Sequence, residues 1–284
     1  MNINELLIYG RKYLLDTQID EIPLKIRLLA ESILKMNKYE LVINHLQDVS
    51  NDDFERFKKG LEKIKNNTPI QYITNNQEFM KLNFYVDENV LIPQPDTEIL
   101  VENVIKYCSV NNSKEFRILD LCTGSGAIAV SLAKYIPNCK IVASDISSKA
   151  LQVAKLNTER NQVIDKVEFV ESDMFENIKT NDFDIIVSNP PYIEKAVIDT
   201  LSPEVQKEPH LALDGGDDGL DFYRIIINQS PNFLKINGKV FLEIGYNQKN
   251  SIFELIQKNA SFATPICIKD LGLNDRVVIS EKIK

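Results

Sequence analysis

The sequence predicts an α/β protein with a doubly wound, Rossmann-like parallel sheet, preceded by a small N-terminal helical bundle and a β-hairpin connector. Three observations support this prediction: helical periodicity up to residue 75, strand-like alternation between residues 77 and 92, and a succession of strands and helices beyond residue 97. The chain has 284 residues, 44% of them hydrophobic and 26% charged, so it can bury a substantial core.

The first predicted domain, residues 1–75, has a helical pattern throughout. Leu24 and Leu28 recur at helical spacing, and the segment from Ser50 to Asp53 has the composition of an N-cap in front of an amphipathic helix. We therefore expect a small helical bundle. Its apolar stripes are those of an ordinary core and by themselves indicate no function.

Residues 76–96 are predicted to connect the helical bundle to the rest of the chain. Apolar and polar side chains alternate around a polar turn between residues 77 and 92, which is typical of a β-hairpin. Pro93 and Pro95 then restrict the backbone at the exit from this segment.

The third predicted domain, residues 97–284, alternates short apolar strands with helical stretches. Such alternation predicts βαβ units and a parallel sheet that is covered on both faces. The strands are expected at Arg117–Leu121, Lys140–Ala143, Val167–Val170, Asp184–Ser188 and Lys239–Ile244. The helices are expected near residues 97–108, 127–135, 148–160 and 220–235.

Composition disfavours several classes of protein. The balance of 33 Lys and Arg against 41 Asp and Glu gives a net charge of −8, which argues against a protein that mainly binds a phosphate backbone. The N-terminus lacks the pattern of a signal peptide, and no uncharged apolar run approaches the roughly 18 residues of a membrane span, so we expect a cytoplasmic protein without a membrane partner. The 4 dispersed cysteines and 2 histidines indicate neither disulfides nor a metal site.

A glycine-rich turn after the first strand of the sheet predicts a nucleotide-like ligand. The strand runs into Cys122-Thr123-Gly124-Ser125-Gly126 and then into a helix. Glycine allows a tight turn and a close approach of the backbone, and the following helix offers free N–H groups. Because the turn also fits the dinucleotide fingerprint, NAD and S-adenosylmethionine both remain candidate ligands at this point.

Acidic residues follow the next two strands. Asp145 ends the second strand, where its carboxylate can accept both ribose hydroxyls of an adenosine; the alternative is an N-cap for the helix that begins near Ser148. Asp173 follows the third strand, where it can bind the exocyclic amine of adenine while Met174 covers the ring. The alternative for Asp173 is an acid in a surface turn.

The most specific signal is Asn189-Pro190-Pro191-Tyr192, directly after the fourth strand. A planar, amide-like nitrogen is a weak nucleophile because its lone pair is delocalised, so its methylation requires acceptors that hold the NH₂ group and orient the nitrogen. The side-chain oxygen of Asn189 and the carbonyl of Pro190, held extended by Pro191, can be these acceptors, and Tyr192 can pack on the flat group.

Catalysis at such a site would depend on orientation and electrostatics, without a strong base. A hydride-transferring dehydrogenase has no use for the tetrapeptide, which favours S-adenosylmethionine over NAD. The competing interpretation is a rigid loop without a chemical role.

Short motifs spread over nearly the whole chain resemble those of one known family. They are Thr68-Pro-Ile-Gln-Tyr72, Glu78-Phe79, Leu91-Ile-Pro-Gln-Pro-Asp-Thr-Glu98, Leu119-Asp-Leu-Cys-Thr-Gly-Ser-Gly126, Ser188-Asn-Pro-Pro-Tyr192, Glu208-Pro-His-Leu-Ala-Leu-Asp-Gly-Gly216 and Leu242-Glu-Ile-Gly245. The family is the bacterial peptide chain release factor glutamine methyltransferases. Its members use S-adenosylmethionine to methylate the glutamine side-chain nitrogen in the Gly-Gly-Gln motif of class 1 release factors.

The resemblance implies a class I methyltransferase fold behind a substrate-docking helical domain. It implies cofactor contacts at the Cys122–Gly126 turn, Asp145, Met174 and Asn189, and substrate contacts at Asn189–Tyr192, with Asn189, Pro190 and Tyr192 in catalytic roles. Gln94 and Asp96 stand where the family usually has Arg and Glu. Cys122 replaces a common glycine and is tolerated if its backbone φ is negative.

Two further features are less specific. Glu243 closes the fifth strand and either faces the pocket or is a surface acid at a strand end. The insertion from about residue 193 to 219, rich in Pro, Gly and Asp, is expected to form a loop over the active site.

The leading hypothesis is therefore methylation of a release factor glutamine by a monomeric enzyme with no stable nucleic-acid partner. The tetrapeptide is shared with enzymes that methylate exocyclic amines of DNA or ribosomal RNA, which form the first alternative. A non-catalytic scaffold with a vestigial cofactor site is the second.

Overall fold

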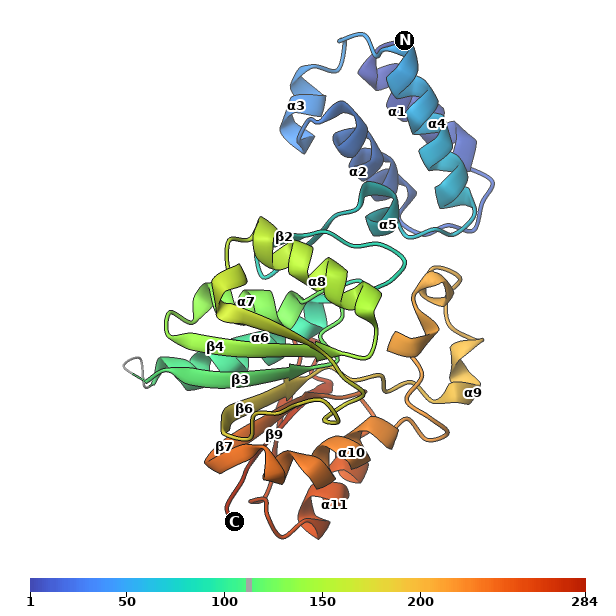
Figure 1. The fold of residues 1–284 in the computed structure, drawn as a ribbon. Helices are drawn as coiled ribbons and strands as arrows, with labels where there is room; N and C mark the ends of the chain where they lie inside the picture. The colour runs from blue at the N-terminus through green and yellow to red at the C-terminus, as the bar shows by residue number, and fades with distance from the viewer. Residues whose placement is uncertain (111–113) are drawn as a thin grey trace. The chain divides into compact units, whose positions relative to one another are not determined.

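The computed structural model describes residues 1–110 and 114–284, which form two compact units (Figure 1). The first unit comprises Met1–Asn76 together with Ser202–Lys207, and the second comprises Gln77–Leu201 and Glu208–Lys284. Most of the predicted connector, residues 76–96, therefore falls within the second unit.

The first unit is a helical bundle. Its α-helices are α1 (Ile3–Leu14), α2 (Ile22–Leu34), α3 (Lys38–Ile43), α4 (Asn51–Lys65) and α5 (Ile70–Thr74). The predicted N-cap is confirmed, because the hydroxyl of Ser50 accepts a hydrogen bond of 3.1 Å from the backbone N–H of Asp53. Leu29, Phe57 and Leu61 are almost completely buried and hold α2 against α4.

The second unit begins with a short β-hairpin, in which β1 (Gln77–Phe79) pairs with β2 (Leu82–Phe84). Met80 and Lys81 form its turn with φ values of 51° and 58°, as a tight two-residue hairpin turn requires. The hairpin is shorter than the predicted range of residues 77–92. Strand pairing stops after Phe84, and the next backbone N–H, at Tyr85, binds the side chain of Asn157 at 2.7 Å.

A seven-stranded sheet forms the centre of the second unit, in the order β5-β4-β3-β6-β7-β9-β8. The first five of these pair in parallel, and β9 and β8 pair antiparallel at one edge. The predicted fold class is confirmed. The strands are β3 (Phe116–Leu121), β4 (Cys139–Asp145), β5 (Val167–Glu171), β6 (Phe183–Ser188), β7 (Leu234–Glu243), β8 (Ile266–Lys269) and β9 (Asp275–Glu281).

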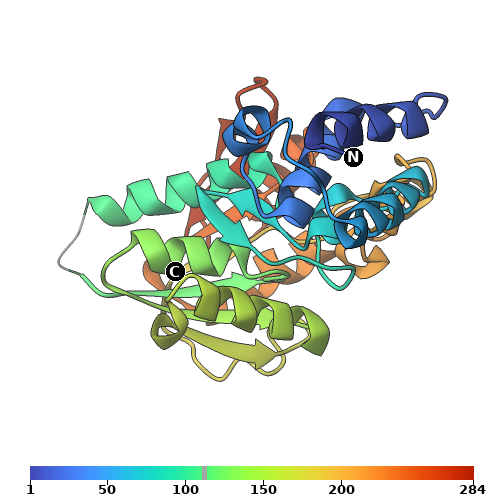
Figure 2. The ribbon, with the colours of Figure 1, turned by 90° about the horizontal axis from the view of Figure 1, so that it is seen from above.

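Both faces of the sheet are covered, because alternate residues of a strand point to opposite sides. Ile118 of β3 packs into one hydrophobic cluster, and its neighbour Leu119 packs into the other. One face carries α6 (Pro95–Ser109), α7 (Ala127–Tyr135) and α8 (Ser148–Arg160), which lie side by side (Figure 2). The opposite face carries α10 (Asp221–Gln229) and α11 (Lys249–Lys258).

The region around residue 230 differs from the prediction. The helix expected at residues 220–235 ends at Gln229, and a 3₁₀ turn at Ser230–Asn232 leads into β7 at Leu234. Pro231 explains the difference, because proline has no N–H to continue the helix and restricts the residue before it. The sequence pattern also did not predict α11, β8 or β9.

Within the part of the chain that the structure describes, no helix combines the length and apolar character that crossing a membrane requires. The same residues contain no cluster of three or more His, Cys, Asp or Glu side chains that could hold a metal ion.

Candidate active site

The glycine-rich turn after β3 takes a left-handed backbone conformation at alternate residues. Cys122, Gly124 and Gly126 have φ values of 58°, 54° and 78°. The expectation of a negative φ at Cys122 is therefore wrong, and a left-handed cysteine costs on the order of 1–2 kcal/mol relative to glycine. Neighbouring contacts hold the turn, among them the hydrogen bond of 2.9 Å from Thr123 N–H to the carbonyl of Ser144.

The two glycines of this turn have different surroundings. A Cβ atom added at Gly124 would meet nothing within 4 Å, so this position leaves space for a ligand. A Cβ atom added at Gly126 would lie 3.0 Å from the Cβ of Ala154, because α8 passes directly against the turn. Gly124 thus opens the pocket, whereas Gly126 allows two helices to approach each other.

This contrast predicts different effects for one extra methyl group. Gly126→Ala should lower the free energy of unfolding by about 2–4 kcal/mol, since it combines an unfavourable φ with steric overlap. Gly124→Ala should lower it by about 1–2 kcal/mol, from φ alone, and should weaken cofactor binding more strongly. Urea unfolding and cofactor titration of both variants check the prediction. Equal losses of stability, or unchanged cofactor affinity in Gly124→Ala, would contradict it.

A buried acid holds the glycine-rich turn through hydrogen bonds. Asp120 is fully buried, and its Oδ2 accepts hydrogen bonds from the Thr123 hydroxyl at 2.6 Å and from Ala129 N–H at 3.2 Å. Burial raises its pKa to about 7, although both hydrogen bonds oppose the shift. The role of this residue cannot be predicted from the sequence, because an acid inside an apolar strand gives no local indication of what it binds.

The raised pKa of Asp120 predicts a dependence of stability on pH. The carboxyl loses its proton near 3.8 in the unfolded chain and near 7 in the folded chain. Between these values the folded state binds more protons, so this group makes the free energy of unfolding fall as the pH rises. The variant Asp120→Asn keeps an acceptor for Thr123 and Ala129, and its free energy of unfolding should fall less steeply with pH than that of the wild type. Urea unfolding from pH 4 to 8 measures this pH dependence. An equally steep dependence in wild type and variant would refute the raised pKa of Asp120.

Asp145, at the end of β4, is bound to the turn rather than to the helix that follows. Its Oδ2 accepts from Gly124 N–H and its Oδ1 from Ser147 N–H, both at 2.9 Å. The alternative of an N-cap is wrong, because Ser147 caps α8 by accepting from Ala150 N–H at 3.2 Å. Each carboxylate oxygen of Asp145 retains a second lone pair, which leaves it able to accept ribose hydroxyls. Burial raises its pKa.

Asp173 and Met174 follow β5 and line the same pocket as Asp145. The side chain of Asp173 is exposed, whereas Met174 is buried and its Sδ lies 3.9 Å from Cys122 Sγ. Met174 has a φ of 47°, so its backbone is as unusual as that of Cys122. The two sulfur-containing side chains give the pocket an apolar surface in addition to the exposed carboxylate.

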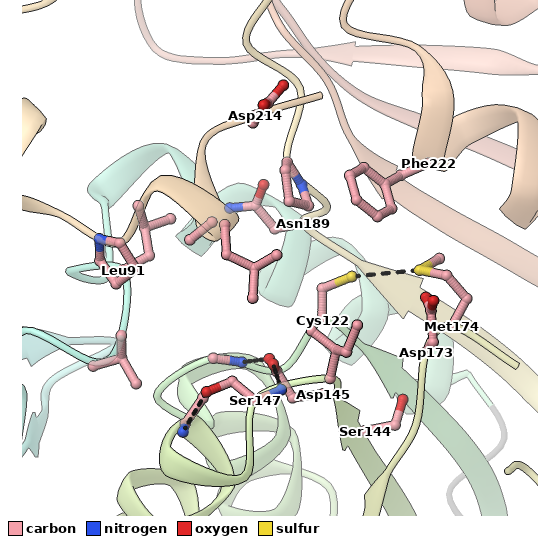
Figure 3. Close-up of a pocket in the computed structure, with 18 of the residues that line it drawn as sticks. Leu91, Cys122, Ser144, Asp145, Ser147, Asp173, Met174, Asn189, Asp214 and Phe222 are labelled. Atoms are coloured by element: carbon pink, nitrogen blue, oxygen red, sulfur yellow. Dashed lines mark hydrogen bonds between the residues drawn. The ribbon is translucent and has the colours of Figure 1, made fainter. Parts of the chain in front are cut away.

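The pocket has a volume of about 520 Å³ and lies where β3, β4 and β6 end (Figure 3). The predicted site residues that line it are Cys122, Gly124, Asp145, Asp173, Met174, Asn189 and Pro191. Those that lie outside its lining are Thr123, Ser125, Gly126, Pro190 and Tyr192. Apolar side chains such as Ile146 and Phe222 line the pocket together with the two carboxylates. Such a lining suits an adenosine, so the residues present fit S-adenosylmethionine.

The tetrapeptide contributes Asn189 and Pro191 to the pocket lining, whereas Tyr192 is half-buried outside it. Asn189 lines the pocket, and its Nδ2 donates a hydrogen bond of 3.1 Å to the Thr97 hydroxyl. Burial together with the nearby charge of Glu243 raises the pKa of the Tyr192 phenol. Within residues 1–110 and 114–284, no donor binds Oδ1 of Asn189, which is left as an acceptor.

Glu243 is buried, so its interpretation as a surface acid is wrong. Its side chain is only 2% exposed, and burial raises its pKa to about 7. Hydrogen bonds from Thr97 and Tyr192 and the charge of Arg276 oppose this rise. Thr97 was not singled out from the sequence, because a threonine in the first turn of a helix has no distinctive local pattern.

The insertion at residues 193–219 packs against the tetrapeptide and contributes to the pocket. Ile193 forms a parallel bridge with Asp214, with backbone hydrogen bonds of 3.0 and 2.8 Å. Gln248 Nε2 joins the carbonyls of Tyr192 and Gly219 at 3.0 and 3.1 Å. The insertion residues that line the pocket are Pro209, Leu211, Ala212, Asp214 and Gly216.

The two positions that depart from the family pattern begin α6. Gln94 is the residue before the helix, and its side-chain nitrogen binds the carbonyl of Ile92 at 3.1 Å. Asp96 forms an ion pair of 2.9 Å with Arg276, which also pairs with Asp270 at 3.1 Å. Neither Gln94 nor Asp96 lines the pocket.

Comparisons with known proteins agree with the site. A family model described as "Methyltransferase small domain" matches residues 94–208, and one described as "PrmC N-terminal domain" matches residues 5–74. A methyltransferase from Pyrococcus furiosus shares the fold with a TM-score of 0.53 at 20% identity, covering 72% of this chain and 91% of its own. The hMettl16 catalytic domain gives a TM-score of 0.57 at 15% identity over 83% of both chains. The protein is an S-adenosylmethionine-dependent methyltransferase.

Curated relatives define its family. The release factor glutamine methyltransferase of Clostridium acetobutylicum is 38% identical over 99% of this chain and 98% of its own length. The protein of the same description from Fusobacterium nucleatum is 40% identical over 88% of this chain and 70% of its own. The chain belongs to the release factor glutamine methyltransferase family.

Proposed function

We propose that this enzyme methylates the side-chain amide nitrogen of the glutamine in the Gly-Gly-Gln motif of class 1 release factors. S-adenosylmethionine supplies an electrophilic methyl group on a positively charged sulfur. The amide nitrogen forms the new bond to carbon, the electrons of the broken carbon–sulfur bond remain on sulfur, and one N–H proton leaves as the nitrogen gains its methyl group.

The observation that carries this proposal is the orientation of Asn189. Its Nδ2 is bound to Thr97, so its free Oδ1 is the atom available to a donor in the pocket. A primary amide offers two N–H donors, and one of them matches this acceptor. The names of the relatives at 38% and 40% identity supply the independent support for glutamine as the substrate.

The residues of the chain would act by holding the amide rather than by removing its proton first. Asn189 Oδ1 accepts one N–H, the carbonyl of Pro190 accepts the other, and Pro191 keeps this backbone extended. Both acceptors gain strength as positive charge develops on the attacked nitrogen, so they stabilise the transition state more than the bound substrate.

Methyl transfer to two versions of a release factor tests the proposal. The protein is incubated with radiolabelled S-adenosylmethionine and a release factor that carries either Gly-Gly-Gln or Gly-Gly-Ala, with a DNA duplex and ribosomal RNA in parallel reactions. Label should enter only the Gly-Gly-Gln protein. Equal labelling of both release factors would refute the proposed glutamine, and labelling of nucleic acid alone would identify the exocyclic-amine alternative.

We also propose that the helical unit docks the release factor. Apolar side chains on and just after α3 are unusually exposed: Tyr39 at 68%, Val42 at 72%, Ile43 at 76% and Leu46 at 71%. Such a contiguous apolar patch is typical of a protein-binding surface. It does not resemble a site for a phosphate backbone, which requires clustered Lys and Arg.

Polar substitutions in this patch should weaken recognition of the protein substrate. The double variant Val42→Ser with Ile43→Ser should raise KM for the intact release factor about tenfold, because exposed side chains at an interface contribute 1–2 kcal/mol when buried. Its kcat and cofactor affinity should stay unchanged. Leu15→Ser is the matched control, since Leu15 is 72% exposed in the same unit but lies away from α3 in sequence. Equal changes of KM in both variants would contradict the docking role of α3.

A further inference from the structure

A chain of polar side chains lies behind Asn189 and ends at a buried acid. Asn189 Nδ2 donates to the hydroxyl of Thr97, which is 5% exposed and lies in the first turn of α6. The carboxylate of Glu243, at the end of β7, lies beside this hydroxyl, and Thr97 opposes the rise that burial causes in the pKa of Glu243. Three elements that are distant in sequence thus contribute one residue each.

The direction of these hydrogen bonds determines which end of the Asn189 amide faces the pocket. A hydroxyl has one hydrogen, and the ionised carboxylate of Glu243 beside it can only accept a hydrogen bond, so the hydrogen of Thr97 is directed toward Glu243. The Thr97 oxygen therefore meets Asn189 with lone pairs only, and binds an N–H. If the amide were flipped, two acceptor oxygens would face each other in a buried site, which is unfavourable.

A purely structural role explains Glu243 poorly. A carboxylate that is 2% exposed is expensive to bury unless a cation pairs with it. The nearby guanidinium of Arg276 instead pairs with Asp96 and Asp270, and Oε2 of Glu243 has no hydrogen-bond partner among the described residues. Such an incompletely satisfied acid next to a reactive site is more typical of function than of stability.

We infer that Thr97 and Glu243 are positioning residues for methyl transfer: they fix the amide of Asn189 with its oxygen toward the substrate. Neither residue lines the pocket, so neither touches the cofactor or the reacting atoms. The inference rests on the proposed function, because it gives Asn189 Oδ1 the role of holding an amide N–H. It extends the site to α6, which none of the matched motifs assigns to the chemistry.

Two pairs of variants test this inference in the full-length protein. Thr97→Val removes the hydroxyl with little change of shape, and Thr97→Ser restores it. Glu243→Leu removes the acceptor, and Glu243→Gln restores an acceptor oxygen. We expect kcat with the release factor to fall about tenfold in the Val and Leu variants, as loss of one oriented hydrogen bond implies, and to stay within about threefold in the Ser and Gln variants. KM for the release factor and cofactor affinity should change less than about twofold.

A double-mutant cycle separates positioning from a general effect on the fold. On an Asn189→Ala background, Thr97→Val should have no further effect on kcat, because the side chain that it positions is missing. The inference would be overturned if Thr97→Val lowered kcat equally in the presence and absence of the Asn189 side chain. It would also be overturned if Thr97→Ser were as impaired as Thr97→Val. If Thr97→Val does not fold, the Glu243→Leu and Glu243→Gln pair gives the same decision.

A spectroscopic measurement decides the orientation without any substrate. In protein labelled with ¹⁵N-asparagine, the side-chain resonance of Asn189 is assigned by its loss in Asn189→Ala. It should shift in Thr97→Val and keep its position in Thr97→Ser. A resonance that is unchanged in Thr97→Val would overturn the inference even if the enzyme is active. A wild-type protein that does not methylate the release factor would refute the proposed function instead, and the resonance would still decide the orientation.

Discussion

Replacement of Asn189 by alanine is expected to reduce kcat about 10²- to 10³-fold, the range typical for loss of one oriented acceptor or donor in a transition state. The side chain has no role in supporting the glycine turn, since its only hydrogen bond in the described structure runs to Thr97. Cofactor affinity should therefore change less than about threefold. Single-turnover methylation and cofactor titration by calorimetry measure the two quantities separately.

An asparagine on the same helix as Thr97 provides the control. The side chain of Asn103 donates to the carbonyl of Ile99 one turn earlier, at 2.8 Å, and it does not line the pocket. Asn103→Ala should leave kcat unchanged. If Asn189→Ala retained more than about a tenth of the wild-type rate, the tetrapeptide would not hold the reacting amide, and the mechanism proposed for this site would be wrong.

The second large effect is expected at Asp145. Asp145→Ala should raise the dissociation constant of the cofactor at least about 100-fold, because two hydrogen bonds to a charged acceptor contribute about 1.5–3 kcal/mol each. The free energy of unfolding should also fall by about 2 kcal/mol, since the N–H groups of Gly124 and Ser147 lose their shared acceptor. Calorimetric titration and urea unfolding check both parts.

Asp173→Ala is the matched comparison at the same pocket. The Asp173 carboxylate is exposed and can contribute one hydrogen bond to adenine, so its loss should weaken cofactor binding about tenfold or less, with no change in unfolding. A larger loss of affinity in Asp173→Ala than in Asp145→Ala would mean that Asp145 does not bind the ribose and only supports the turn.

Features of the fold that depend on local pattern could be predicted from the sequence. The parallel strands are short apolar runs ended by polar or glycine residues, and a strand buried on both faces has this pattern wherever it occurs. The positions of Asp145 and Asn189 followed from the same logic, because parallel strands bring their carboxyl ends to one edge of the sheet. The predicted helix end at residue 235 is wrong, because apolar residues continue beyond Gln229 although Pro231 cannot continue the helix.

The supporting residues could not be predicted, because their roles depend on contacts between distant segments. Thr97 and Glu243 are separated from Asn189 by long stretches of sequence, and only the packing of α6 and β7 brings the three together. The left-handed conformation of Cys122 has a similar origin. Cysteine has no preference for that conformation, so it is imposed by the hydrogen bonds and packing around the turn rather than by the residue itself.

The helical unit is built from two pieces of chain that are far apart in sequence. Ser202–Lys207 belongs to it, and Glu204 supplies the carboxylate for the ion pair with Lys25, whose side chain is buried. During synthesis, the ribosome has made most of the sheet before this last piece emerges, so the helical unit is completed late although it begins first. A fragment cut after residue 76 would leave the ammonium group of Lys25 without its carboxylate. No single cut in the chain therefore yields the complete helical unit.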